Sequence, residues 1–264
     1  QTYCDYEVIV VNDSSTDNSL EVASSFQDER IHIYTKENEG VSAARNYGIM
    51  HAKYDYIAFL DADDIWESDY LECQKKLIEI YTDAGIYSTA FYSLEKGKRK
   101  LRNVLINEHT HFLVHDYFKE SVMNGLSICW TSSLCLKKEV IKEIPMFRVG
   151  IKRGEDLDLW LRIALNYDVA YLNLPKVFYR TGLSDSLTSD YSKNGEFPYY
   201  EWFNFTSESS YYRKYVILVV YIHAKNAFIH HDYDTCLAEL WSVKTIAWRF
   251  KWAERLLLLV ISWI

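Results

Sequence analysis

The segment YIAFLDADDIW, residues 56–66, joins an apolar run to three closely spaced carboxylates. The apolar part predicts a buried strand, and Asp61, Asp63 and Asp64 follow at its carboxyl end. Like charges this close disfavour one another's ionisation, so folding alone gives no reason to gather them there. Carboxylate oxygens suit Mg²⁺ or Mn²⁺, which substrate phosphates commonly complete. The alternative is a solvated acidic turn, in which Asp64 favours the dipole of the next helix.

Strands and helices alternate along the first half of the chain. The predicted elements, strand and helix in turn, are residues 6–13, 15–26, 31–36, 41–52, 54–61 and 67–83. This alternation predicts an α/β fold with right-handed crossovers and a mostly parallel, Rossmann-like sheet flanked by helices. Ligands bind such sheets at the carboxyl ends of the strands, which is where Asp13 and Asp61 fall.

The second half is less regular and changes character near residue 184. The expected elements before that point are strands at 84–94 and 126–138, an amphipathic helix at 154–167 and an extended segment at 169–181. Beyond it, helical patterns cover 212–228 and 232–243. We therefore predict an α/β domain at residues 1–183 and a C-terminal helical region at residues 184–264.

Composition narrows the class of protein. A length of 264 residues suits one large domain, or one domain with an appendage. A net charge of -8 without an apparent basic stripe argues against a nucleic-acid partner. Aromatic residues make up 16%, which fits a surface for sugar rings or a membrane interface, or else an aromatic-rich core. Five cysteines without a C-x-x-C pair indicate free thiols and hence a cytoplasmic protein.

The last segment, residues 241–264, has tryptophan and leucine at helical spacing with lysine and arginine between them. Such a face is typical of a helix lying in a membrane interface, at the inner face of the cell membrane and near a lipid-linked acceptor. A helix packed back onto the domain explains the same pattern, and both interpretations stay open. No apolar run reaches the ~20 residues that a membrane-spanning helix needs.

Four blocks of sequence occur together in one known family. They are YEVIVVND before Ser14, NEGVSAARN around Arg45, LDADD around Asp63 and GEDLDLWLR around Asp156. With them the chain resembles the inverting family 2 glycosyltransferases of GT-A fold over about residues 1–190. The resemblance implies hexosyl or N-acetylhexosaminyl transfer from a nucleoside-diphosphate sugar, most simply a UDP-sugar. The implied acceptor is a hydroxyl of a glycan or polyprenyl-linked glycan, and the implied cofactor is Mn²⁺ or Mg²⁺.

The same resemblance assigns roles to single residues. Asp156 is implied as the catalytic base with Glu155 beside it, and Asp63 as the metal ligand. Trp130 is expected on the acceptor side. The implied donor-binding residues are Asp13, Arg45, Asp61 and Arg180. Gly182 stands where the family often has a histidine, so Arg180 alone is expected to approach the diphosphate.

Several of these residues have a structural alternative. Asp13 can cap the helix predicted at 15–26, and Glu155 can simply favour a helix N-terminus. Arg45 can form a structural pair with Asp61 or Asp64. Asp158, on the predicted helix 154–167, is expected to face solvent.

The sequence leaves two alternative functions open, and it lacks a strand and a helix that the family normally has. The family normally has one more strand and helix before its first block, so we expect the chain to be part of a longer protein. A sugar-nucleotide or glycan-binding module without catalysis is the main alternative, and Glu155 and Asp156 argue against it. A nucleotidyltransferase shares the sheet and the carboxylates, but its glycine-rich phosphate loop would lie in a part outside this chain.

Overall fold

The computed structural model describes residues 1–264 except 106, 152, 183–198, 203–204 and 248–264. The described strands are β1 (Val8–Asn12), β2 (Ile31–Thr35), β3 (Tyr56–Ala58), β4 (Ile65–Trp66), β5 (Ile86–Glu95), β6 (Lys98–Arg102), β7 (His111–Val114), β8 (Leu134–Lys137) and β9 (Val169–Thr181). The described helices are α1 (Ser19–Ser24), α2 (Val41–His51), α3 (Tyr70–Ile80), α4 (Tyr117–Asn124), α5 (Lys138–Glu143), α6 (Glu155–Ala164), α7 (Tyr199–Trp202), α8 (Tyr212–Ile229) and α9 (Tyr233–Ala247), with a 3₁₀ turn η1 (Thr131–Ser133). Most elements predicted from the sequence are present, and most are shorter than expected.

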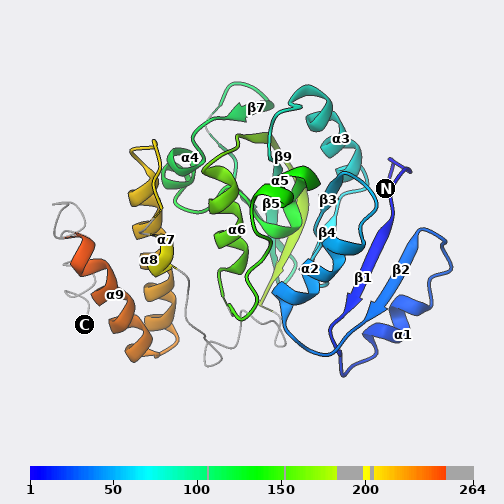
Figure 1. Cartoon of the computed structure of the whole chain (residues 1–264), viewed down its shortest axis with the longest axis horizontal. Coiled ribbons are helices and arrows are strands. Elements are labelled where there is room, and N and C mark those ends of the chain that lie inside the picture. Colours follow the sequence, from blue (N-terminus) through cyan, green and yellow to red (C-terminus); the bar gives the residue numbers. More distant parts are fainter. Residues whose placement is uncertain (106, 152, 183–198, 203–204, 248–264) are drawn as a thin grey trace.

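A seven-stranded sheet lies at the centre of the molecule (Figure 1). Its strands follow the order β3-β8-β5-β9-β4, with β6 added to β5 and β7 added to β9. β5 and β9 run parallel, as do β1 and β2, which form a separate two-stranded sheet. The remaining five pairs are antiparallel. The α/β class is confirmed, but the sheet is mixed and not mostly parallel. The two-residue turn between β5 and β6, for example, can join only antiparallel strands.

Helix α6 lies against the sheet and forms the middle of the core (Figure 1). Its residues Leu159, Trp160 and Ile163 are fully buried. The same hydrophobic cluster holds Val216 and Val220 of α8. Burial of such side chains stabilises the fold by about 1.5–3 kcal/mol each. Helix α8 is therefore packed into the core that supports the sheet.

The C-terminal helices pack side by side at one end of the molecule (Figure 1). The hydroxyl groups of Tyr215 in α8 and Tyr117 in α4 form a hydrogen bond of 2.9 Å. The predicted boundary at residues 183 and 184 lies outside the described residues, as does most of the segment 241–264. Within the described residues no helix is both long and apolar enough to cross a membrane. The domain boundary and the membrane-facing segment stay predictions.

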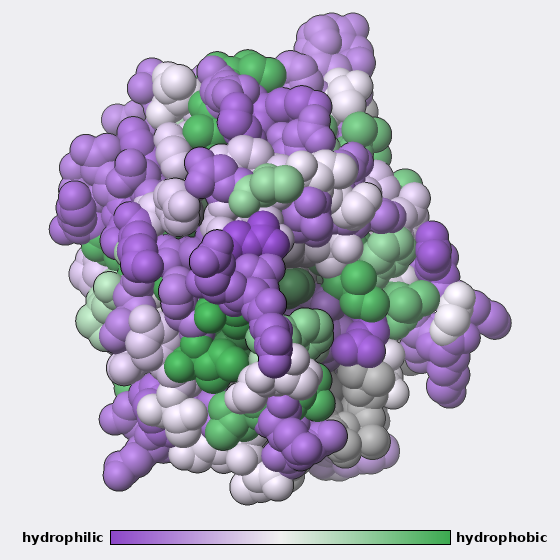
Figure 2. All heavy atoms as spheres, turned by 90° about the vertical axis from the view of Figure 1, so that its right-hand side faces the viewer, coloured by the Kyte–Doolittle hydropathy of each residue, from purple (hydrophilic) through white to green (hydrophobic). Residues whose placement is uncertain are grey.

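Helix α1 and strand β2 lie at the end of the molecule opposite α9 (Figure 1), and Figure 2 shows that face. Hydrophobic patches there interrupt a mainly hydrophilic surface. Helix α1 exposes Leu20 and Val22, and the exposed Phe26 follows it. The expectation of a further strand and helix before the first sequence block stays a prediction.

Candidate active site

The carboxylate of Asp13 follows β1 and faces the start of α2. It accepts hydrogen bonds from the backbone amides of Gly40 at 2.8 Å and Glu39 at 3.2 Å, and from Lys36 Nζ at 2.9 Å. Burial alone would raise the pKa of Asp13, but these bonds outweigh it and hold the pKa below its usual value. The N-cap residue of α1 is Asn18, so the helix-capping alternative for Asp13 is wrong.

Arg45 on α2 joins two of the predicted site residues. Its guanidinium donates to Asp61 Oδ1 at 2.8 Å and to Glu155 Oε1 at 2.8 Å. Burial alone would lower the pKa of Arg45, but the nearby negative charges of Asp61, Glu155 and Asp156 raise it. Arg45 therefore stays charged and ties the loop after β3 to the start of α6. The pair with Asp61 considered from the sequence is confirmed.

Asp63 and Asp64 lie between β3 and β4, opposite Arg180 of β9. Arg180 donates its backbone amide to Asp64 Oδ1 at 3.1 Å and its side chain to the carbonyl oxygen of Asp63. Asp64 is buried, and burial raises the pKa of this carboxyl to about 6. The structure thus places Arg180 directly on the loop predicted to hold a metal ion.

Asp156 lies in the first turn of α6 and faces η1. Its Oδ2 accepts a hydrogen bond from the Thr131 hydroxyl at 3.1 Å, and its Oδ1 accepts one from the Leu157 amide at 2.7 Å. Thr131 directly follows Trp130, whose ring centroid lies 4.6 Å from that of Tyr179. The predicted base and the predicted acceptor-side tryptophan are therefore held together by η1.

Glu155 and Asp156 share a partly buried acidic site. Burial is the largest influence on both groups, and it raises the pKa of Glu155 to about 7 and that of Asp156 above its usual value. The charge of Asp156 adds to the rise for Glu155, while Arg45 opposes it. The N-terminal end of α6 also favours the ionised forms, but burial outweighs this dipole.

Replacement of Glu155 by glutamine is expected to change how stability depends on pH. Because the pKa of Glu155 rises from 4.5 to about 7, the folded protein keeps a proton that the unfolded chain has lost. The stability linked to this proton is complete below pH 4.5 and is lost as the pH rises through 7. That loss is ~3 kcal/mol at most. Glu155→Gln should therefore gain stability relative to the wild type above neutral pH but not in acid.

Urea unfolding of both proteins at about pH 4 and about pH 8 measures this difference. Asp168→Asn, at a half-buried carboxylate paired with exposed His115, is the matched control. A stability difference between the wild type and Glu155→Gln that is the same at both pH values would contradict the prediction.

The sequence profile of Glycosyl transferase family 2 matches residues 1–144, which is more than half of the chain. The chain belongs to glycosyl transferase family 2. The matched part of this family 2 chain holds Asp13, Arg45, Asp61 and Asp63, whereas Asp156 lies beyond it. The family predicted from the sequence blocks is thereby confirmed.

Several bacterial glycosyltransferases are similar to this family 2 chain. Glycosyltransferase GlyA of Streptococcus pneumoniae is 31% identical over 191 residues, which cover 68% of this chain and 27% of GlyA. The putative teichuronic acid biosynthesis glycosyltransferase TuaG of Bacillus subtilis is 30% identical over 174 residues, 65% of each chain. An uncharacterized glycosyltransferase of Rickettsia felis is 35% identical over 169 residues, 62% of this chain and 26% of that protein. The chain thus spans from about a quarter to about two thirds of these relatives.

Among solved structures, residues 1–349 of S. aureus TarS in complex with UDP-GlcNAc share the fold. The TM-score is 0.60 at 18% sequence identity, over 71% of this chain and 53% of the TarS chain. This likeness confirms the GT-A fold expected for a family 2 member.

The residues around Asp63 fit a divalent cation only together with a substrate. Asp61, Asp63 and Asp64 supply the carboxylate oxygens that Mg²⁺ and Mn²⁺ prefer. Asp61 is bound by Arg45, and Asp64 accepts a hydrogen bond from a backbone amide. Of the three carboxylates, that of Asp63 is therefore the one expected to bind the cation. Among the described residues, no group of three or more His, Cys, Asp or Glu is arranged to hold a metal ion. Asp63 and the oxygens of a bound diphosphate would have to hold it together, as is usual for Mg²⁺.

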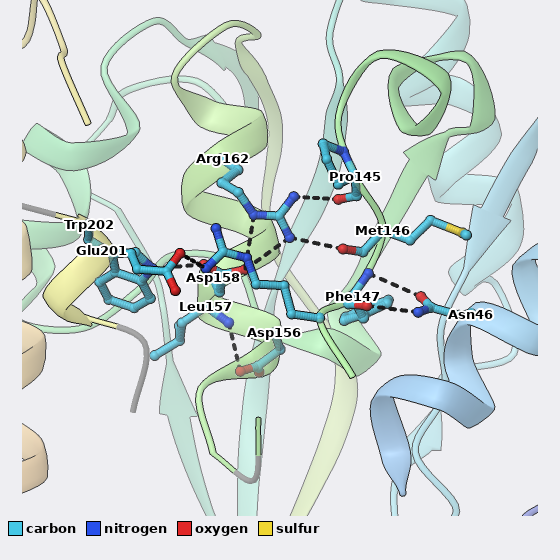
Figure 3. Close-up of polar contacts among 11 residues, drawn as sticks. Asn46, Pro145, Met146, Phe147, Asp156, Leu157, Asp158, Arg162, Glu201 and Trp202 are labelled. Carbon is cyan, nitrogen blue, oxygen red and sulfur yellow. Dashed lines mark hydrogen bonds and ion pairs between the residues drawn. The ribbon is translucent and has the colours of Figure 1, made fainter. Parts of the chain in front are cut away.

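The prediction that Asp158 faces solvent is wrong. Asp158 is fully buried and accepts hydrogen bonds from Arg162 Nε at 2.9 Å and Trp202 Nε1 at 2.8 Å (Figure 3). Arg162, one turn further along α6, also donates to the carbonyl oxygens of Pro145 and Met146. A buried carboxylate needs such partners, because water can no longer solvate its charge.

The network around Asp158 continues to α2 and α7 (Figure 3). Phe147 exchanges two backbone hydrogen bonds with the Asn46 side chain of α2, at 2.7 and 3.0 Å. Arg148 lies 3.4 Å from the Asp158 carboxylate and forms an ion pair with Glu201 of α7. The segment before α6 therefore links three helices and fixes the helix that carries the predicted base.

Three polar side chains of the site were not predicted from the sequence: Lys36, Thr131 and Ser132. The Ser132 hydroxyl accepts a hydrogen bond from the Asp61 amide at 3.1 Å, and the Ser132 carbonyl accepts one from Trp66 Nε1 at 2.7 Å. The run TSS at 131–133 interrupts an otherwise apolar strand pattern. Such a break is the signal that could have identified η1.

Proposed function

We propose that this chain carries the active site of an inverting glycosyltransferase that uses a nucleoside-diphosphate sugar, preferentially a UDP-sugar. The observation that carries the proposal is the Arg45 bridge, with 2.8 Å to Asp61 and 2.8 Å to Glu155. Through this bridge, the loop that holds Asp61 and the start of α6, which carries Asp156, are tied to the same side chain. Membership of family 2 supports sugar transfer, and the UDP-GlcNAc bound to TarS supports a UDP-sugar donor.

In the proposed reaction, Asp156 accepts the proton of an acceptor hydroxyl as that oxygen attacks the anomeric carbon. The bond between this carbon and the diphosphate oxygen breaks, and the nucleoside diphosphate leaves with the electron pair. A single displacement inverts the configuration, so an α-linked donor gives a β-linked product. The hydrogen bonds from Thr131 and the Leu157 amide orient the Asp156 carboxylate before the proton moves. A positioned base of this kind contributes ~10²- to 10⁴-fold to the rate.

Other residues bind and orient the donor in this proposal. Asp13, at the end of β1, contacts the nucleotide, and Arg45 and Asp61 lie beside it. The cation of Arg180 lies on the Asp63 loop, where it can balance the charge of the diphosphate. A divalent ion held by Asp63 would, when bound, neutralise the charge of the leaving group.

The acceptor and the cellular site are further parts of the proposal. Trp130 is partly exposed and directly precedes Thr131, so an acceptor sugar could contact its ring there. The name of TuaG supports a role in bacterial polysaccharide assembly, with a glycan or polyprenyl-linked glycan as acceptor. Five free thiols favour the cytoplasm, and the segment 241–264 would bring the enzyme to the inner face of the membrane.

Incubation with a panel of nucleotide sugars and Mn²⁺ or Mg²⁺ tests this function. We expect metal-dependent UDP release from at least one UDP-sugar. Asp63→Ala should weaken metal-dependent UDP binding by at least ~100-fold in calorimetry, because loss of a direct ligand exceeds the effect of outer contacts. Asp83→Ala, at an exposed carboxylate after α3, is the control and should bind as the wild type does.

Two results would overturn the proposal. Nucleotide-sugar binding without any turnover would identify a binding module that lacks catalysis. Unchanged metal-dependent UDP affinity of Asp63→Ala would remove the metal assignment.

A further inference from the structure

The hairpin formed by β5 and β6 concentrates positive charge on an acidic protein. It carries five basic side chains within seven positions, Lys96, Lys98, Arg99, Lys100 and Arg102, while the chain as a whole has a net charge of -8. Lys96 and Gly97 form its turn with φ angles of 48° and 77°, as a tight type I′ turn requires. All five residues of β6 are exposed. The hairpin is therefore an accessible basic element.

Three of these cations form a row on one face of the hairpin. Lys100 is paired with Ser93, Arg102 with Phe91, and Lys98 with Glu95 across the two strands. Residues directly paired across strands point to the same face, and alternate residues lie about 7 Å apart. The hydrogen bond from Arg102 Nε to Ser93 Oγ, 3.2 Å long, agrees with this placement. We call Lys98, Lys100 and Arg102 the basic row.

The basic row leads toward the acceptor side of the candidate active site. Phe91, the partner of Arg102, has its ring centroid 5.6 Å from that of Trp130. Tyr179 lies against the same tryptophan, at 4.6 Å. Trp130 precedes Thr131, whose hydroxyl donates to Asp156. The Arg102 end of the row thus lies beside the proposed acceptor site, and Lys100 is paired with Ser93, which neighbours Tyr179 in the sheet.

Within the described part of the chain, the one carboxylate directly paired with the basic row is Glu95, opposite Lys98. None of the five basic side chains forms an ion pair with a described carboxylate, whereas Lys36 and Lys76 both do. Arg99 points to the other face, with its guanidinium 4.7 Å from the centre of the Phe178 ring. Edge strands often carry lysine to prevent aggregation, but either sign of charge serves that purpose. Five positive charges gathered in one hairpin indicate that it attracts an anion.

We propose that the basic row docks an acidic acceptor glycan, a chain with carboxylate or phosphate groups along its length. The proposal rests on the proposed transferase function, because it names the acceptor class of that site. A row of cations at regular spacing, ending beside Trp130, fits a linear polyanion whose end enters the active site. A membrane surface would also require apolar side chains among the cations. The apolar residue of β6, Leu101, alternates with the row and lies on the other face.

Charge reversal of the basic row tests the proposal. The variant Lys98→Glu/Lys100→Glu/Arg102→Glu keeps a charged edge strand, so it separates docking from protection against aggregation. The control variant Lys53→Glu/Lys119→Glu/Lys142→Glu changes three exposed lysines elsewhere and alters the net charge equally. The probes are a fluorescent oligogalacturonate and a neutral maltooligosaccharide of the same length, measured by anisotropy. UDP titration with Mn²⁺ reports donor-site integrity in every protein.

The wild type should bind oligogalacturonate at least ~10-fold more tightly than the neutral probe, as several exposed ion pairs would allow. The row variant should lose this preference and the control should keep it. The difference should vanish at 1 M salt, where the Debye length falls to ~3 Å. If the triple variant does not bind UDP, Lys100→Glu alone is used, with the same expectation at a smaller effect.

Oligogalacturonate affinity that is equal in the row variant and the wild type would overturn the inference. Binding to phosphatidylglycerol vesicles would be measured as well. If the row variant lost binding to these vesicles but kept binding to oligogalacturonate, the inference would also be overturned and the row would be a membrane contact. Failure of the wild type to bind UDP would instead count against the proposed function, and the two failures are therefore distinguishable.

Discussion

Replacement of Asp156 by asparagine is expected to lower sugar transfer by ~10²- to 10⁴-fold while donor affinity changes little. Asparagine has the same shape, and its carbonyl oxygen can still accept from the Leu157 amide, which lies 2.7 Å from Asp156 Oδ1. Its amide can donate to the Thr131 hydroxyl, so the local geometry is kept. It cannot accept a proton in the transition state. An interaction made only there changes turnover and leaves donor binding intact.

The comparison with Glu155→Gln separates the two neighbouring carboxylates. Glu155 is bound by Arg45, so it is less free than Asp156 to take a proton from an acceptor. Turnover of Glu155→Gln should therefore fall less. Near-normal turnover of Asp156→Asn, together with an inactive Glu155→Gln, would assign the base to Glu155.

The parts of the fold with strong local patterns could be predicted from the sequence. Strand β1 and helices α2, α3 and α6 were expected because apolar residues recur with the matching period. Asp13 follows β1 and Asp61 follows β3, as the strand pattern predicted, but these two strands belong to separate sheets. The helix around Asp156 was found from its apolar stripe.

Strand β6 could not be predicted in this way. Its sequence, KRKLR, has almost no apolar alternation, because both of its faces are exposed. It becomes a strand because it pairs with β5 through a tight turn, where Gly97 adopts a positive φ. The same segment holds the basic row, so the expectation that the chain carries no basic stripe is wrong.

The position of Asp158 could not be predicted for a different reason. Three carboxylates in the first turn of a helix usually indicate a solvated face. Arg162, four residues further on, could have signalled an ion pair on the same side of the helix. Nothing local indicates Trp202, which is 44 residues away and meets Asp158 only in the tertiary fold.

Replacement of Asp158 by alanine is expected to lower the free energy of unfolding by ~3–5 kcal/mol. Arg162 would keep its bonds to two backbone carbonyls but would lose its carboxylate partner inside the protein. Arg148 and the Trp202 indole would lose the same acceptor. Asp168→Ala removes a more exposed aspartate paired with His115 and should cost ~1 kcal/mol or less. Urea unfolding of the two variants measures the contrast.

Two further variants show whether the cost comes from the unpaired charges. Asp158→Ala/Arg162→Met removes both members of the pair and should recover part of the lost stability, since an apolar pair needs no solvation. Trp202→Phe keeps an aromatic ring in the core but removes the indole donor to a buried carboxylate, and should cost ~1.5–3 kcal/mol. If Asp158→Ala costs no more than Asp168→Ala, the buried pair does not hold α6 in place. The helix that begins with Glu155 and Asp156 would then be fixed by its apolar face alone.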